Sequence, residues 1–216
     1  MRIKWLGHAA FLITSEKGLR IITDPYSPAF GGIRYKRIDE EADIVLVSHD
    51  HGDHNAVSDV RGKPAVVRGP GYHRIRDVEI KGIESFHDDA KGKSRGPNTI
   101  FCFAVDEVKI CHLGDLGHLL SSDQVRDIGE VNVLLIPVGG FFTIGPTEAT
   151  HVVEALRPNI VIPMHFKTPK CDFPISGVDE FLKGKERVRR EKRSEIEITK
   201  EALPEPVEII VLEHAN

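Results

Sequence analysis

The segment Ser48-His49-Asp50-His51-Gly52-Asp53-His54 is the most informative stretch of the chain. It follows the apolar run Asp43-Ile44-Val45-Leu46-Val47, which has the length and the β-branched content of a buried strand. Three histidines and two aspartates share these seven positions. Imidazoles crowded beside carboxylates have little packing value, so this heptad (residues 48–54) requires a chemical explanation.

Metal binding supplies one, because imidazole nitrogen and carboxylate oxygen are the ligands that Zn²⁺ takes. His49 and His51 are two residues apart, so an extended segment points them the same way. Gly52 permits a sharp turn, which lets Asp53 and His54 face a second position. The pattern His-x-His-x-Asp-His therefore predicts ligands for two adjacent metal ions. The alternative is a solvated polar loop, although short His-rich tracts usually bind metal.

The heptad resembles the signature of the metallo-β-lactamase superfamily, and the later motifs of that superfamily follow in order. They are His87 in the run 84–88, Asp115 in the run 112–115 and His165 in the run 162–166. The runs 5–13 and 137–140 are similar to those of small metal-dependent hydrolases related to L-ascorbate-6-phosphate lactonase. The resemblance implies an α/β fold, the four-layer αββα sandwich.

The resemblance also implies two divalent metal ions, with zinc expected and manganese or iron as alternatives. One ion would take His49, His51 and His87, the other Asp53, His54 and His165, and Asp115 would bridge them. The local sequence agrees, because the three ligands outside the heptad each follow an expected strand, where loops at one end of a sandwich converge. Taken alone, His165 could be a core-end histidine and Asp115 a turn residue.

Four further residues are candidates for contacts around the metals or the substrate: His8, Asp24, His118 and Lys167. The family places His8 at the rim of the site, and a structural hydrogen bond is the alternative. Asp24 matches a family position near the site, and turn capping is the alternative. His112 and His118 flank Asp115, and the strand position of His112 favours a structural role. Lys167, two residues after His165, is a candidate anion contact.

The expected reaction is hydrolysis by a metal-bound hydroxide, because two zinc ions lower the pKa of a shared water toward ~7. Asp53, as ligand and hydrogen-bond acceptor, is the expected catalytic residue that orients it. No Gly-x-Ser-x-Gly and no candidate cysteine nucleophile is present, so direct attack by water is expected. The basic stretch Lys91–Arg95 follows His87 and could be a mobile loop that contacts an anionic ester, lactone or phosphoester; a solvated loop is the alternative.

Other functions within the same fold remain alternatives. Di-iron oxidoreductases resemble the heptad but carry glutamate where this chain has His51, and they normally work with a flavin domain. Nuclease-like phosphodiesterases carry an extra domain for which the length leaves little room. The basic run 183–200 is interspersed with glutamates, which favours a solvated face over a nucleic-acid surface. A metal-binding protein without catalysis is not supported, because every expected ligand is present.

Composition sets the wider expectations. The length of 216 residues and 40% hydrophobic content predict a single domain spanning residues 1–216. A net charge of -4 gives no bias toward nucleic acid or membrane, so a small-molecule substrate is expected. Three cysteines without Cys-x-x-Cys spacing argue against a disulfide framework. With no signal-peptide core or membrane-spanning run, we expect a cytoplasmic protein, and homo-oligomers are common among such enzymes.

Strands dominate the expected secondary structure, and helices are few. Period and composition predict strands at 3–6, 11–14, 19–23, 43–47, 65–68, 78–83, 99–105, 108–112, 133–138, 160–164 and 207–212. Ser121 is an expected N-cap, and Pro146 an expected first helical residue. Weaker helical patterns occupy 55–59 and 177–183, and Gly139–Thr143 is expected to form a pocket wall or a flexible connection.

Overall fold

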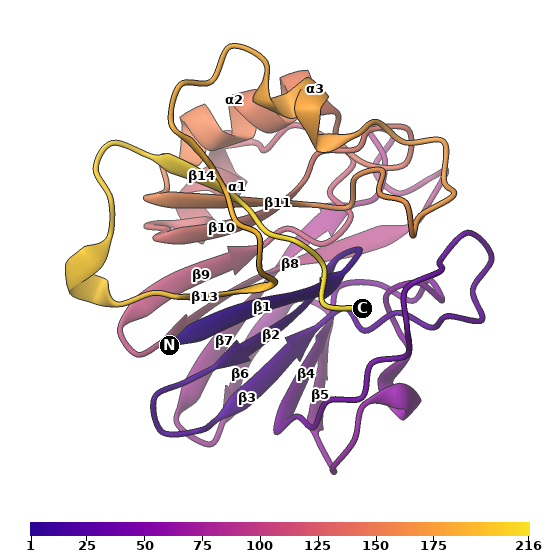
Figure 1. Ribbon diagram of the computed structural model, residues 1–216, viewed down its shortest axis with the longest axis vertical. Coiled ribbons are helices and arrows are strands. Elements are labelled where there is room, and N and C mark those ends of the chain that lie inside the picture. The colour runs from indigo at the N-terminus through magenta and orange to yellow at the C-terminus, as the bar shows by residue number, and fades with distance from the viewer.

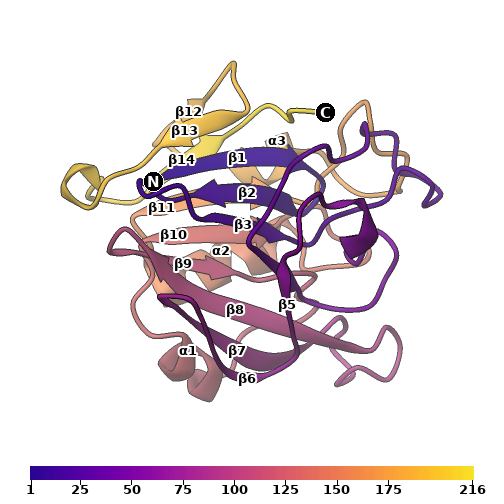
Figure 2. The same ribbon diagram turned by 90° about the horizontal axis from the view of Figure 1, so that it is seen from below.

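The computed structural model describes residues 1–216 and contains two sheets packed face to face (Figure 1). The first sheet has six strands in the order β13-β1-β2-β3-β4-β5, and the second has eight in the order β12-β14-β11-β10-β9-β8-β7-β6. Figure 2 shows β1, β2 and β3 lying across β9, β10 and β11. The α/β fold with two packed sheets at its centre, as expected from the sequence, is thereby confirmed.

The strands of the first sheet are β1 (Arg2–Gly7), β2 (Ala10–Thr14), β3 (Arg20–Thr23), β4 (Ile44–Val47), β5 (Ala65–Arg68) and β13 (Glu195–Glu197). Those of the second are β6 (Gly71–Ile75), β7 (Val78–Phe86), β8 (Pro97–Val105), β9 (Val108–His112), β10 (Val133–Pro137), β11 (Ile160–Met164), β12 (Val188–Arg190) and β14 (Glu208–Val211). The helices are α1 (Ser122–Ile128), α2 (Pro146–Leu156) and α3 (Val178–Leu182), with short 3₁₀ turns η1 (Val57–Asp59) and η2 (Lys200–Ala202). No helix is long and apolar enough to cross a membrane.

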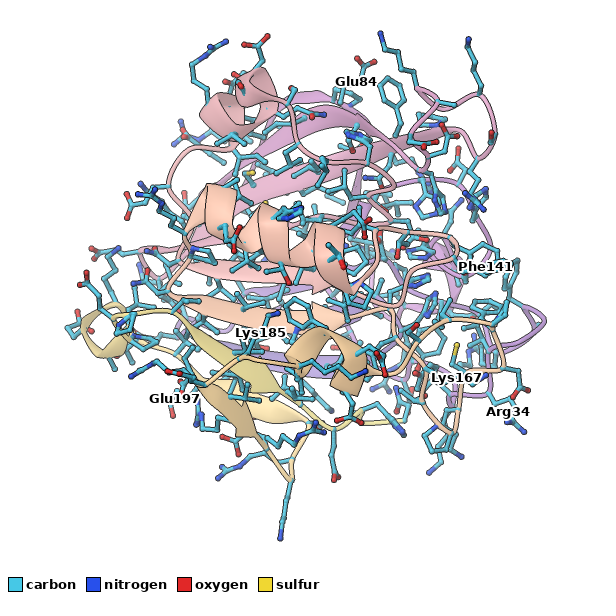
Figure 3. All side chains as sticks on the ribbon, turned by 90° about the horizontal axis from the view of Figure 1, so that it is seen from above. Arg34, Glu84, Phe141, Lys167, Lys185 and Glu197 are labelled. Carbon is cyan, nitrogen blue, oxygen red and sulfur yellow. The ribbon has the colours of Figure 1, made fainter.

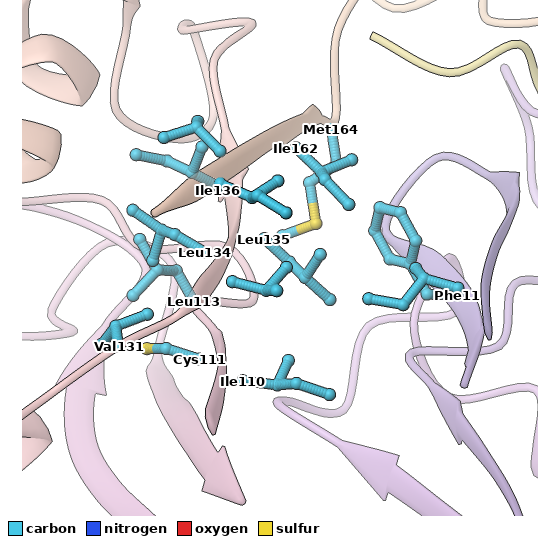
Figure 4. Close-up of a cluster of buried hydrophobic side chains, with 14 of the residues drawn as sticks. Phe11, Ile110, Cys111, Leu113, Val131, Leu134, Leu135, Ile136, Ile162 and Met164 are labelled. Atoms are coloured by element: carbon cyan, nitrogen blue, oxygen red, sulfur yellow. The ribbon is translucent and has the colours of Figure 1, made fainter. Parts of the chain in front are cut away.

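The main core lies between the two sheets. Figure 4 shows side chains of the second sheet, among them Ile110, Leu135 and Met164, gathered opposite Phe11 of β2, and all four are buried. Burial of this apolar surface is the main force that holds the sheets together.

The outer faces of the two sheets are covered differently. Helices α2 and α3 cover the second sheet (Figure 3), whereas segment 25–43 packs Tyr26, Tyr35 and Ile38 on the first. Strand β4 is therefore buried on both faces, because Ile44 and Leu46 join the main core while Val45 and Val47 join this outer cluster. That double burial explains why its sequence is a continuous apolar run rather than an alternating one.

Three strands, β6, β12 and β13, lie outside the strands expected from the sequence. All three are edge strands, and two of them fall in the basic run 183–200. Three of the four arginines of that run pair with carboxylates: Arg189 and Arg193 with Glu191, and Arg190 with Asp179. Most of the charged side chains of the run are exposed, as expected for a solvated face.

Helix α1 begins where the sequence predicts, with Ser121 as its N-cap. The Ser121 hydroxyl accepts a hydrogen bond from the Gln124 amide at 3.1 Å, and the Gln124 side chain accepts one from the Ser121 amide at 3.0 Å. This reciprocal arrangement is a capping box. Helix α2 begins at Pro146, also as predicted.

Replacing Ser121 with alanine should lower the free energy of unfolding by about 1 kcal/mol, because one amide at the helix start loses its acceptor. Denaturant-induced unfolding measures the change. Ser122→Ala removes a neighbouring exposed hydroxyl with no capping bond and serves as the control. Equal effects of the two substitutions would contradict the capping role.

The strand directions gather the expected metal ligands at one end of the sandwich. In the first sheet β1, β3 and β4 run the same way, and in the second sheet β7, β9 and β11 do. His8, Asp24, the heptad, His87, Asp115 and His165 follow the carboxyl ends of these strands. Residues far apart in the sequence therefore converge on one site.

Candidate metal centre

One carboxylate oxygen lies at the centre of the site, surrounded by imidazoles. Oδ2 of Asp115 is 3.1 Å from Nε2 of His87, 3.2 Å from that of His54, 3.3 Å from that of His165 and 3.8 Å from that of His49. All five side chains are buried. This oxygen lies next to histidines from both of the ligand sets that the resemblance implies, with Asp115 expected between them.

The possible metal ligands form three groups, and the third of them, Asp24, His49 and His54, shares a histidine with each of the other two. His49, His51 and His87 form the first group, and Asp53, His54 and His165 form the second together with His8; within each group the ligand atoms lie within 4.8 Å of one another. The first two groups agree with the sequence-based assignment except for His8, which the sequence places only at the rim.

Buried atoms without hydrogen-bond partners show that the site suits divalent cations. Nε2 of His49, Nε2 of His54 and Oδ1 of Asp115 are buried and bond to no protein atom. An unpaired buried polar atom costs about 1–3 kcal/mol. A cation held between the two groups would satisfy these lone pairs, so the residues fit a metal centre.

Asp24 holds the metal-site histidines in position through hydrogen bonds on the side away from the proposed metals. Its Oδ1 accepts the Ser48 amide at 2.7 Å, and its Oδ2 accepts the Ser48 hydroxyl at 2.7 Å, His112 Nε2 at 2.9 Å and His54 Nδ1 at 3.1 Å. Ser48 Oγ in turn lies 2.9 Å from Nδ1 of His49. Because carboxylates only accept, His54 must carry its proton on Nδ1, which leaves the Nε2 lone pair for a metal.

The charge of Asp24 is stabilised by these contacts. Burial alone would raise the pKa of its carboxyl, but His112 and His54 outweigh burial and hold that pKa well below its usual range. The backbone of Asp24 adopts a φ of +39°, in the left-handed region. Such strain persists where the surrounding structure over-determines the conformation, as at functional sites.

His8 is part of the site, and its motif explains how it is held. The His8 carbonyl accepts hydrogen bonds from Nε1 of Trp5 at 3.0 Å and from the amide of His165 at 3.2 Å. The His8 ring lies 4.1 Å from the His165 ring, and its Nε2 is 3.2 Å from Oδ2 of Asp53. Burial lowers the pKa of His8 to about 4, so at neutral pH His8 is an uncharged donor to Asp53.

The charges of the central residues complement one another. Burial would lower the pKa of His54, but the carboxylates of Asp115 and Asp53 raise it well above its usual value. A cation bound there would displace the proton on Nε2 and take that lone pair. Burial and the neighbouring His54 lower the pKa of His49 to about 3. The centre thus holds anionic carboxylates that attract a cation and, in His49, a neutral imidazole that can ligate one.

Two of the candidate residues lie outside the site, which corrects the sequence-based assignment. His118 accepts the Phe86 amide on Nε2 at 3.1 Å, and its Nδ1 is 2.8 Å from the Leu119 carbonyl, so its ring serves the turn after β7. Lys167 is exposed, and its ammonium donates to the Phe173 carbonyl at 2.9 Å. Lys167 also does not line the cavity beside the centre.

The sequence does not reveal the supporting roles of Ser48 and Asn98, or the partner of His112. His112 flanks Asp115, and its strand position favours a structural role, but it binds Asp24 instead. Ser48 links Asp24 to His49. Asn98 accepts the Asp115 amide at 3.0 Å and donates to the Leu113 carbonyl at 3.0 Å. The sequence shows only that these polar residues lie at the ends of apolar strands. It does not show which residues they bind, because most of their partners are distant in the sequence.

Gly139, in the segment expected to form a pocket wall, permits a close approach to His165. A Cβ atom at residue 139 would lie 2.3 Å from the His165 carbonyl oxygen, whereas one at Gly177 would meet nothing within 4 Å. Gly139→Ala should therefore displace His165, lower the free energy of unfolding by about 1–3 kcal/mol and reduce the metal bound per chain. Unfolding and metal analysis beside Gly177→Ala test this, and equal behaviour of the two variants would contradict it.

Comparison with known proteins agrees with this geometry. The family model described as "Beta-lactamase superfamily domain" matches residues 2–165. The chain belongs to the β-lactamase superfamily. The narrower relation to L-ascorbate-6-phosphate lactonase stays a prediction.

Two relatives within the superfamily are close enough to compare in detail. The UPF0173 metal-dependent hydrolase of Thermococcus onnurineus is 33% identical over 78% of this chain and 85% of its own length. A crystal structure from Thermotoga maritima, proposed as a Zn-dependent hydrolase of the metallo-β-lactamase superfamily, is 40% identical with a TM-score of 0.83 over 98% of both chains. The chain is a metal-dependent hydrolase of this superfamily, as its sequence predicts.

Proposed function

We propose that the chain uses two divalent metal ions, with zinc as the first choice, to hydrolyse a small ester, lactone or phosphoester by direct attack of water. The observation that carries this proposal is the position of Asp115 Oδ2, 3.1 Å from His87 in one ligand group and 3.2 Å from His54 in the other. A carboxylate shared between two ligand groups suits a two-metal site.

The ligands in this proposal come from both sheets. One ion would be held by His49, His51 and His87, and the other by Asp53, His54 and His165. Asp115 would bind both ions. Bound there, the ions would lower the pKa of a water molecule toward ~7 and polarise the carbonyl or phosphoryl oxygen of the substrate. Asp24 and Ser48 fix the imidazoles in advance, so little reorganisation opposes binding.

We assign to Asp53 the orientation of the attacking water. Burial would raise the pKa of its carboxyl, but His54 and His8 outweigh burial and lower that pKa, which keeps Asp53 ionised at neutral pH. Asp53 lines the cavity and accepts a hydrogen bond from His8. Its carboxylate can therefore accept a hydrogen bond from the attacking water, while the hydrogen bond from His8 holds the carboxylate in place.

The three cysteines and Ser48 are poorly suited to act as nucleophiles in place of water. Ser48 Oγ is committed to Asp24 and His49. Cys171 is buried, and burial raises the pKa of its thiol. Cys102 and Cys111 pair within strands β8 and β9, with sulfur atoms 3.8 Å apart. These positions support water as the attacking group.

Two other activities occur within this fold, and each can be distinguished from the proposed one. Residue 51 distinguishes the oxidoreductases, and the substrate distinguishes the phosphodiesterases. A di-iron oxidoreductase of this fold is disfavoured because His51 offers an imidazole where those enzymes carry glutamate. Phosphodiesterase activity is an outcome of the substrate panel. We expect a small-molecule substrate, without a nucleic-acid or membrane partner.

A substrate panel tests the proposal. Protein loaded with zinc, manganese or iron would be given lactones, carboxylic esters, phosphomonoesters and phosphodiesters before and after chelation. We expect turnover of one class that chelation removes and metal restores. Turnover that persists without metal would contradict the proposal, and oxygen-dependent chemistry with iron alone would replace it by the redox function.

A further inference from the structure

A cavity of about 400 Å³ opens directly onto the metal centre. Its floor contains Asp53, Asp115 and three of the histidines, and its sides contain Phe30, Phe142, Phe173 and Arg95. The volume suits a small ligand rather than a polymer. A larger hollow of about 700 Å³ lies beside the start of β4 at the other end of the sandwich, and no histidine lines it.

Three phenylalanines, Phe30, Phe142 and Phe173, form one continuous aromatic wall of the cavity. The ring centroids of Phe30 and Phe173 are 6.3 Å apart at 85°, and those of Phe142 and Phe173 are 5.6 Å apart at 73°. These edge-to-face contacts stabilise the wall. It presents an apolar surface next to a highly polar floor.

Glycines bring the aromatic wall close to the heptad. A Cβ atom at Gly52 of the heptad would lie 2.6 Å from the Phe30 ring, and one at Gly32 would lie 2.4 Å from the Phe173 ring. Phe173 also packs against His8, with ring centroids 5.7 Å apart. The apolar surface is therefore fixed within reach of any group bound at the metal centre.

The basic stretch after His87 is anchored, not free, because Asp88 binds its backbone. The buried carboxylate of Asp88 accepts the amides of Ala90, Gly92, Ser94 and Arg95 at 2.7–2.9 Å. Among the basic residues of this loop only Arg95 lines the cavity, whereas Lys91 lines a separate hollow beside His118. The basic loop thus contributes one positively charged side chain, Arg95, to the cavity, and the hydrogen bonds of Asp88 fix the backbone that carries it.

The Arg95 guanidinium has no acidic partner. One of its nitrogens donates to the Phe141 carbonyl at 3.0 Å, and its central carbon lies 5.7 Å from the Phe142 ring. It forms no ion pair with any carboxylate and is the one lysine or arginine on the cavity lining. A guanidinium held against an aromatic ring, with donors to spare, is well suited to bind a carboxylate or phosphate group.

We infer that the substrate combines an anionic group, which Arg95 binds, with a flat apolar group, which the aromatic wall of Phe30, Phe142 and Phe173 binds. The scissile bond of the substrate would lie next to the metal centre, while its anionic and apolar groups contact Arg95 and the aromatic wall. This inference rests on the proposed hydrolase function and assigns Arg95 as the residue that determines specificity. Neutral analogues of the same shape lose the Arg95 contact and bind less well.

Calorimetric binding to the metal-loaded protein tests the inference without turnover. The probes are 3-phenylpropionate, phenylphosphonate and the neutral 3-phenylpropionamide. We expect Arg95→Gln to weaken binding of the better anionic probe by about 10- to 100-fold and to leave the amide unchanged. The tighter of the two anions identifies carboxylate or phosphate as the natural group.

Lys93→Gln is the matched control, because it removes the same charge from the same loop at an exposed residue that does not line the cavity. Phe173→Leu should weaken binding of 3-phenylpropionate more than binding of acetate. Metal content and thermal unfolding verify that each variant is folded and loaded.

The inference is overturned if Arg95→Gln binds both anions as the wild type does, since the anions would then be held by the metals alone, or if no probe binds. Failure of the proposed hydrolase function gives a different result, in which anions bind through Arg95 but no ester, lactone or phosphoester is cleaved.

Discussion

Replacing Asp115 with asparagine should reduce turnover by at least about 10³-fold and lower the metal content of the purified protein. A single oxygen of this side chain lies 3.1–3.8 Å from four imidazole nitrogens. The amide keeps the shape but loses the negative charge that two cations would share, and metal sites contribute several kcal/mol to catalysis. Turnover of the substrate class found in the panel and elemental analysis measure the two effects.

Asp50→Asn is the control for this experiment. Asp50 belongs to the heptad but is exposed and pairs with Arg68 and Asn55 away from the centre. Its substitution should leave metal content and turnover unchanged. A fully loaded, fully active Asp115→Asn protein would contradict the bridging role, and circular dichroism would exclude unfolding as the cause of lost activity.

Replacing Asp24 with asparagine should weaken metal binding by about 10- to 100-fold, although Asp24 is not one of the proposed ligands. Its carboxylate fixes His54 directly and His49 through Ser48. It is fully buried, so its loss should also lower the free energy of unfolding by about 3–5 kcal/mol. Competition with a chelator and denaturant-induced unfolding measure the two quantities.

Asp43→Asn is the comparison for Asp24. Asp43 precedes β4 and accepts the Arg20 amide at 2.9 Å, whereas Asp24 follows the carboxyl end of the parallel neighbour β3. The variant therefore removes a carboxylate at the end of the sheet opposite to the metal centre. The metal affinity of the Asp43→Asn variant should equal that of the wild type. If Asp24→Asn also kept its affinity, the hydrogen bonds behind the imidazoles would have no influence on the metals.

The sequence predicted most of the fold and most of the centre because both depend on local patterns. Strand β4 is a continuous apolar run, and the heptad follows it directly, so the strand and its ligands are encoded together. His87 and His165 likewise follow strands that apolar residues define. The edge strands β12 and β13 were not predicted because they have three residues each, and β6 because its sequence has no apolar run. Pairing with a neighbouring strand stabilises all three.

Contacts between distant residues could not be predicted in the same way. His112 binds Asp24, which is 88 residues away in the sequence. Phe30 and Phe173 belong to irregular segments without period, and only the folded chain places their rings together. Lys167 and His118 were predicted from their nearness in sequence to His165 and Asp115, but the backbone turns their side chains to carbonyl and amide groups elsewhere.

The metal-to-chain ratio of the wild-type protein tests the central claim most directly. The protein would be purified without added metal, loaded with excess zinc, desalted and measured by elemental analysis beside Asp115→Asn. Two ligand groups around one shared carboxylate predict about two ions per wild-type chain and fewer in the variant. A ratio near one or zero for the loaded wild type would contradict the account, because the ligand groups on either side of Asp115 would not form a two-metal centre.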